Sequence, residues 1–191
     1  MKYFATATAA LAMAATTALA APEKYTLDAS HSQIMFSYDH LGFSTTYNMF
    51  SGFNGEIMFD EQDPAASSVT VSMPVKSMFT GWEERFEHFM GDDFFGATED
   101  DMITFTSTAI EVTGEDTAMI TGDLTMNDVT RSVTLDAKLN KADMHPMAGK
   151  PWLGFDATTT LLRSDFDLGM FAPHVSDEVD VVISIEAMLD E

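Results

Sequence analysis

EVDVVISIEAML, residues Glu178–Leu189, decides the fold class, because apolar and polar side chains alternate along its whole length. One face carries Val179, Val181, Ile183, Ile185, Ala187 and Leu189, and the other carries Asp180, Ser184 and Glu186 among others. A period of two residues is that of a β-strand with one buried face and one face in water. This stretch therefore predicts a strand in an antiparallel sheet.

The same alternation recurs along the chain, and clusters of Gly, Asp, Asn, Ser and Pro separate the alternating runs. The expected strands are residues 24–28, 33–40, 49–59, 67–73, 103–112, 118–124, 132–139, 153–162 and 178–189. Successive antiparallel strands with one wet face close into a barrel or stack as a sandwich, and the pattern alone does not choose between them.

One segment breaks the strand pattern. Residues 80–95, TGWEERFEHFMGDDFF, place their apolar side chains at helical spacing: Trp82, Phe86, Phe89 and Met90. Thr80 is the predicted N-cap, with Glu83 three residues later, and Gly91 suits the C-terminal end. A short helix among strands can close one end of a barrel. No internal repeat or linker appears, so we expect one domain.

Residues 1–20 predict the compartment. Lys2 is followed by an apolar Ala, Leu and Met core and by the small-residue ending Ala18-Leu19-Ala20. This is the pattern of a secretory signal peptide, and its apolar core is too short to span a bilayer. We therefore expect an exported, periplasmic protein with no stable membrane insertion, whose mature domain covers residues 21–191.

The charge of the chain excludes some partners. There are 31 Asp and Glu against 9 Lys and Arg, a net charge of −22. Nucleic acids and anionic lipid headgroups need Lys and Arg to neutralise phosphate, so neither is an expected partner of this acidic protein. The chain has no Cys, which excludes disulfides and thiolate chemistry.

Catalytic and metal-binding signals are weak. The five His residues form no HExxH motif and no close pair on a helical face, and no GxSxG motif occurs. We predict no catalytic residue, no metal site and no cofactor. An enzyme acting on an exported lipid or amide is the alternative, with His31 and His40 as its candidate residues.

The apolar inventory is unusual, with 15 Phe and 15 Met. Met is flexible and polarizable, so a lining of Met and Phe suits a long, bendable hydrocarbon. From composition alone, an ordinary core in which Met fills gaps is the favoured interpretation. A stress-induced structural protein with a filled barrel is therefore a further alternative.

Five ordered blocks of the sequence resemble the YceI-like family. They are YTLDASHSQIMFSYDHLGFSTTYNMFSGFNGEIMFD at 25–60, the segment from Thr80-Gly81 through Arg85 and His88 to Asp93-Phe94-Phe95, ITFTS at 103–107, GDLTMNDVTRSVTLD at 122–136, and the late GF, RSDF and DEV at 154–155, 163–166 and 177–179. The chain departs from the family pattern with Asn48 and Asp167 in place of Gly, Phe86 in place of an acid after Arg85, and Asn127-Asp128 in place of His-Gly. Asn-Asp still predicts a turn before Val129.

The resemblance implies an all-β fold, an eight-stranded antiparallel lipocalin-like barrel with a short helical insertion, that binds a polyisoprenoid or an isoprenoid quinone inside. Residue parity then gives the candidate lining: Phe36, Phe43, Phe50, Phe53, Met73, Phe89, Phe105, Leu135, Phe155 and Ile183. Arg85, Arg131 and Arg163 lie in matched motifs, and Arg85 and Arg163 are the candidates taken for a polar ligand head, although ion pairs with nearby acids such as Glu84 and Asp165 are the favoured use.

The acidic charge favours a neutral head, a quinone or an alcohol, over a pyrophosphate. The leading hypothesis is a non-catalytic protein that carries such a lipid in the periplasm. A homodimer, in which two copies pair through a flat outer strand face, is left open by the sequence.

Overall fold

The computed structural model describes residues 21–190, so the predicted signal peptide lies outside the described residues. Within this part the chain forms ten strands and one α-helix. The strands are β1 Glu23–Leu27, β2 Gln33–His40, β3 Ser44–Phe50, β4 Asn54–Phe59, β5 Ser68–Pro74, β6 Met102–Val112, β7 Thr117–Met126, β8 Val129–Met144, β9 Pro151–Leu162 and β10 Glu178–Leu189; the helix is α1 Glu83–Met90. Short 3-10 turns are η1 Pro64–Ala66, η2 Val75–Ser77 and η3 Arg163–Phe166.

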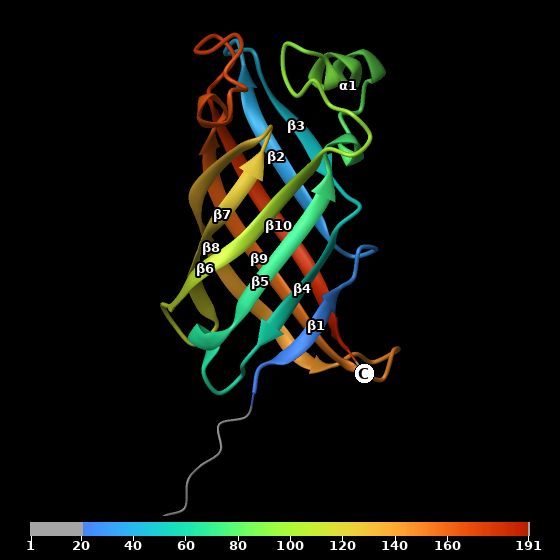
Figure 1. Ribbon diagram of the computed structural model, residues 1–191, viewed down its shortest axis with the longest axis vertical. Helices are drawn as coiled ribbons and strands as arrows, with labels where there is room; N and C mark the ends of the chain where they lie inside the picture. Colours follow the sequence, from blue (N-terminus) through green and yellow to red (C-terminus); the bar gives the residue numbers. More distant parts are fainter. Residues whose placement is uncertain (1–20, 191) are drawn as a thin grey trace, which may run out of the picture.

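The strands close into an antiparallel barrel with eight strand positions (Figure 1). Two positions are each shared by a pair of consecutive strands. β2 pairs with the first half of β10, and β1 pairs with the last residues of β10. On their other sides, β2 pairs with β3 and β1 pairs with β4. The fold class expected from the sequence is confirmed.

The single strand predicted at residues 49–59 is wrong, because the chain bends between β3 and β4. Gly52 takes a φ of +69°, which an alternating apolar pattern does not reveal and which glycine adopts without steric cost. Ser51 fixes the bend, since its N–H donates to Ser77 Oγ at 3.4 Å. The first residues of β3, STTYN, were not predicted as a strand because polar residues dominate them.

Three residues that depart from the family pattern adopt positive φ angles. The Asn127–Asp128 turn between β7 and β8 forms as predicted, with both residues at positive φ, 53° and 60°. Asp167, in place of Gly, also adopts a left-handed conformation at φ 58°. Asn and Asp tolerate this region better than other non-glycine residues.

Helix α1 lies at the end of the barrel where β2 ends and β10 begins (Figure 1). The predicted Gly91 end is confirmed, but Thr80 is not the N-cap: Trp82 occupies that position without a side-chain cap bond. The Thr80 hydroxyl donates instead to the Trp82 carbonyl at 2.7 Å. No helix in residues 21–190 is long and apolar enough to cross a membrane.

Many of the buried side chains fall into two clusters, one toward each end of the barrel. The cluster under α1 centres on Phe50, Phe53, Met73, Val75, Met78 and Ile103. The cluster at the opposite end centres on Tyr25, Leu27, Ile57, Leu153 and Ala187. The middle of the β6–β9 wall belongs to neither cluster, and this leaves space inside the barrel.

Candidate functional site

A cavity of about 800 Å³ runs through the barrel interior. Alternate residues of the strands line it, as the period of two requires. The parity predicted for β10 is borne out, because Val179, Val181, Ile183 and Ile185 all face the cavity. The volume lies in the range of small-molecule sites and contradicts the alternative of a barrel filled by side chains.

Eleven of the twelve candidate residues from the sequence line this cavity. They are Phe36, Phe50, Phe53, Met73, Arg85, Phe89, Phe105, Leu135, Phe155, Arg163 and Ile183. Phe43 does not line the cavity and is a wrong prediction: it lies in the turn between β2 and β3, and 88% of its surface is exposed. The strand parity used to select Phe43 has no meaning at a turn.

Sequence reasoning missed other lining residues, and the same parity would have found those named next except Ile110, because the parity of β6 changes at the irregularity between Ser107 and Ala109. Tyr38 on β2, Ile110 on β6, Ile120 on β7 and Leu161 on β9 all face the cavity. Thr46 on β3 also lines it, but no pattern predicted that strand residue. Most of the residues that line the cavity between its two ends are apolar.

Polar residues line the cavity mainly at its two ends, apart from Asp156 and Thr159 near the middle of β9. The end near α1 carries His40, Ser44, Thr46, Glu84, Arg85, His88 and Arg163. The opposite end carries Ser67, Ser68, Glu115, Asp116 and Thr117. An elongated apolar ligand with one polar group fits this distribution in either direction.

The guanidinium of Arg163 donates hydrogen bonds to backbone carbonyls. It donates to Leu168 O at 2.6 Å, Ser176 O at 2.9 Å, Val175 O at 3.0 Å and Met170 O at 3.1 Å. Burial lowers the pKa of Arg163, and Asp177 opposes that effect. The favoured ion pair with Asp165 does not form among the described residues. Four of the five guanidinium N–H donors bind carbonyls instead, and these bonds hold the 168–176 loop in place.

Arg85 is less committed than Arg163. One guanidinium nitrogen donates to Thr80 O at 3.1 Å, and the guanidinium carbon lies 5.8 Å from the centre of the Trp82 ring. The favoured ion pair with Glu84 does not form among the described residues. Arg85 therefore keeps donors at the α1 end of the cavity.

Asn48 is a buried amide whose side-chain atoms have no hydrogen-bond partner among residues 21–190. Only 4% of Asn48 is exposed. It lies on β3 between the cavity-lining Thr46 and Phe50, and β2 pairs Phe36 with it. Buried amides without partners are costly, so this position is a local weakness of the fold.

Asn48→Leu is expected to raise the free energy of unfolding by about 1–3 kcal/mol, because it removes two unsatisfied polar atoms at similar volume. Urea unfolding checks this. The comparison variant is Asn127→Leu, which removes a satisfied amide that donates to Phe166 O at 2.9 Å at a position of positive φ, so it should lower stability through both the lost hydrogen bond and backbone strain. A loss of stability in Asn48→Leu as well would contradict the assignment of Asn48 as unsatisfied.

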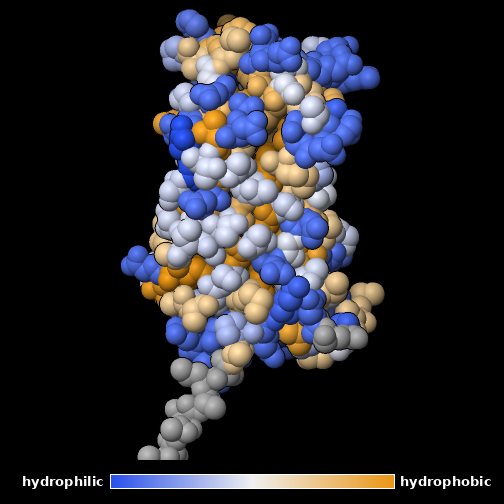
Figure 2. Space-filling view, viewed as in Figure 1, coloured by the Kyte–Doolittle hydropathy of each residue, from blue (hydrophilic) through white to orange (hydrophobic). Residues whose placement is uncertain are grey.

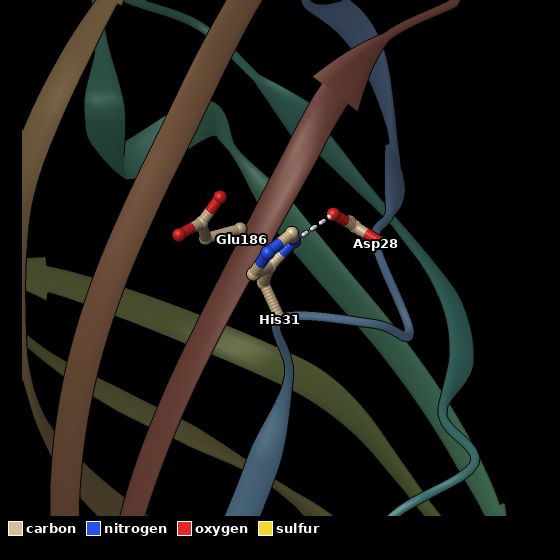
Figure 3. Close-up of side chains that lie close together, drawn as sticks. All are labelled: Asp28, His31 and Glu186. Carbon is tan, nitrogen blue, oxygen red and sulfur yellow. Dashed lines mark hydrogen bonds and ion pairs between the residues drawn. The ribbon is translucent and has the colours of Figure 1, made fainter. Parts of the chain in front are cut away.

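The two histidines considered for an enzyme are not brought together. His31 lies two residues before β2 and His40 is the last residue of β2, so roughly 30 Å of largely extended chain separates them. His40 lines the cavity, whereas His31 is exposed and forms a cluster with Asp28 and Glu186 (Figure 3). No common catalytic centre can include both.

Asp28, His31 and Glu186 offer one ligand atom each within 4.8 Å of one another, and they are the one group in the described chain that could hold a metal ion. Protein partners already occupy them. His31 Nδ1 lies 2.6 Å from Asp28 Oδ2, Ser30 donates to Asp28 Oδ1, and Trp152 Nε1 donates to Glu186 Oε2 at 2.7 Å. These hydrogen bonds explain why the three side chains lie together, so we interpret the cluster as structural.

The cluster predicts a pH dependence. The hydrogen bond to Asp28 raises the pKa of His31 above 6.5, and although burial acts against ionisation, hydrogen bonds from His31 and Ser30 lower the pKa of Asp28 below 3.8. The His31 contribution to stability is fully present below pH 6.5 and is lost as the pH rises through its raised pKa. The Asp28 contribution is present above pH 3.8 and is lost as the pH falls through its lowered pKa.

Asp28→Asn should therefore lower the pKa of His31 toward its ordinary value, as measured by NMR titration of the imidazole. Glu186→Gln is the control, because Glu186 makes the smallest contribution to the His31 pKa and should change it less. An unchanged pKa in Asp28→Asn would mean that the hydrogen bond does not form in solution.

Comparison with known proteins gives consistent matches. The family model described as the YceI-like domain matches residues 25–187. Protein YceI of Shigella flexneri is 38% identical over 180 residues, which cover 94% of this chain and 93% of that protein.

Solved structures share the barrel. The YceI protein of Campylobacter jejuni superposes with a TM-score of 0.71 at 28% identity, over 80% of this chain and 90% of that one. A polyisoprenoid binding domain from Saccharophagus degradans superposes with a TM-score of 0.67 at 14% identity, over 87% of this chain and 98% of that one. At this identity the second structure supports the fold alone.

Proposed function

The chain belongs to the YceI-like family, and we propose that it binds a long isoprenoid lipid inside its barrel and carries that lipid in the periplasm without any covalent step. The observation that supports this proposal is the continuous cavity of about 800 Å³ with an apolar middle and polar ends. The polyisoprenoid binding by the Saccharophagus degradans domain adds support, as a property of a protein with the same fold.

Burial of hydrocarbon supplies the affinity. Each methylene removed from water is worth roughly 0.8 kcal/mol, so about ten buried carbons give roughly 8 kcal/mol before ordering costs. Affinities near micromolar need a net free energy of about that size. A ligand with more buried carbons has a surplus to offset its lost flexibility.

The polar group of the ligand is proposed to be neutral, a quinone or an alcohol. Arg163 donates to four carbonyls, whereas Arg85 donates to one, so Arg85 is the guanidinium lining the cavity with more free donors. Glu84 lies beside it on α1 and also lines the cavity, so the polar end is not a concentrated positive site. A pyrophosphate needs several donors or cations and fits this end poorly.

Native mass spectrometry of the protein purified from its exported form tests the proposal, followed by solvent extraction of the released ligand. The expected result is one adduct of isoprenoid mass per barrel. A protein that carries no lipid, and that binds none when a prenyl alcohol is supplied in detergent, would overturn the proposal. Detection of the protein in the periplasmic fraction tests the compartment separately.

A further inference from the structure

Exposed apolar side chains gather at the α1 end of the barrel. They come from three separate segments, the β2–β3 turn, the residue before α1 and the loop after η3, and we call them the apolar rim: Leu41, Phe43, Trp82, Met170 and Phe171. Their exposed fractions are 49%, 88%, 58%, 40% and 52%. Single exposed apolar residues are ordinary on a protein surface, but a group at one end needs an explanation.

Backbone contacts and one contact between side-chain rings hold the rim segments together. Leu41 N–H donates to His174 O at 3.1 Å, and the neighbouring His40 forms a β-bridge with Val175. On the other side, the Phe171 ring lies 6.2 Å from the His88 ring of α1. All three segments lie at the end of the barrel opposite the C-terminus (Figure 1).

The rim is continuous with the cavity. Trp82 and Phe171 are exposed to solvent and also line the cavity. In the space-filling view, tan and orange atoms lie between blue ones at this end of the molecule (Figure 2). A hydrocarbon that leaves the cavity here meets apolar side chains before it meets water.

We propose that the apolar rim docks on the surface of a lipid bilayer whose headgroups carry no net charge, so that the ligand passes directly between the bilayer and the cavity. This inference rests on the proposed function, because a lipid cargo is what makes a bilayer the matching surface. The rim side chains protrude from turns and loops on separate segments, and such anchors enter a soft interface more readily than they fit a flat protein face.

Acidic residues around the rim select the kind of bilayer. Glu83, Glu84 and Glu87 lie on α1, and Asp165 and Asp167 lie at the base of the rim loop. Together with the net charge of −22, they oppose approach to anionic headgroups. Docking should therefore favour zwitterionic lipids, and added salt should reduce the penalty on anionic ones.

The opposite end of the barrel provides a matched control. Met147, in the β8–β9 turn at the other end of the barrel, is 92% exposed, close to the 88% of Phe43, and like Phe43 it does not line the cavity itself. Phe43 and Met147 are thus about equally exposed, but Phe43 belongs to the rim, whose Trp82 and Phe171 line the cavity.

The test measures the rate at which the protein takes a prenyl alcohol from phosphatidylcholine vesicles, with vesicles removed by flotation. The double variant Leu41→Asn, Phe43→Ser keeps a residue suited to the positive φ of Leu41 and changes no cavity-lining side chain. We expect its uptake rate to fall about tenfold or more, since burying one Phe is worth about that factor. Met147→Ser should transfer lipid at the wild-type rate.

Two further arms separate the outcomes. The double variant should bind prenyl alcohol delivered in detergent as well as wild type does, and phosphatidylglycerol vesicles should slow wild-type uptake in a salt-dependent way. Unchanged uptake by the double variant, equal slowing by Met147→Ser, or a change of oligomeric mass in the double variant, which would make the rim an interface between copies, would each overturn the inference. If wild type binds nothing in detergent, the proposed function itself fails.

Discussion

Arg163→Met is expected to lower the free energy of unfolding by about 3 kcal/mol, because four carbonyls lose a charged donor at once. Each hydrogen bond to a charged group is worth about 1.5–3 kcal/mol, and the four do not add fully because they share one side chain. Methionine keeps much of the apolar stem, so the loss reports the hydrogen bonds rather than packing.

Urea unfolding measures the effect, and Arg131→Met is the matched control. Arg131 also lies in a motif shared with the family, but it is exposed and donates only to Thr130 O at 3.0 Å, so its replacement should change stability by less than about 0.5 kcal/mol. Equal stability of the two variants would mean that the 168–176 loop holds its place without Arg163.

This prediction also shows what the sequence could not provide. The RSDF motif marked Arg163 as important, but Asp165 was the obvious partner in sequence. The actual acceptors are carbonyls five to thirteen residues away, and every residue has a carbonyl, so no side-chain pattern identifies them. Which backbone atoms converge on a guanidinium depends on the path of the loop.

The strands were predictable where one face is buried and the other is wet. β10 was predicted with its bounds, because its alternation continues over twelve residues. β3 and β4 were not separated, because the bend at Gly52 depends on a backbone angle and on a contact with Ser77, far along the chain. The first residues of β3 are polar and show little apolar–polar alternation. They form a strand because they pair with β2.

The cavity lining was predictable for a related reason. Parity gave inward residues on most long strands, but it named none on β7, it changes along β6 at the irregularity between Ser107 and Ala109, and Phe43 failed because it lies in a turn. Volume was not predictable, since alternation is the same for a filled barrel and a hollow one. Space remains because the two buried clusters lie toward the ends, while Ile120 and Leu135 on the β7–β8 wall belong to neither.

That open wall permits the most direct test of the cavity as the binding site. Ile120 and Leu135 are cross-strand partners, and both line the cavity. Replacing both with Trp projects two large rings into the open space, where they should not meet the overpacking penalty of a filled core. We expect the lipid retained per barrel to fall at least tenfold, by native mass spectrometry, with the fold preserved by circular dichroism.

Thr134→Trp controls for the added bulk. Thr134 adjoins Leu135 on β8, is exposed on the outer face, and its hydroxyl meets that of Thr121 at 3.1 Å. Because neighbouring strand residues point to opposite faces, the same ring placed there stays outside the barrel. If Thr134→Trp retains lipid and the Ile120→Trp, Leu135→Trp double variant does not, the ligand lies inside; if both retain it, the lipid binds elsewhere and the cavity is not the site.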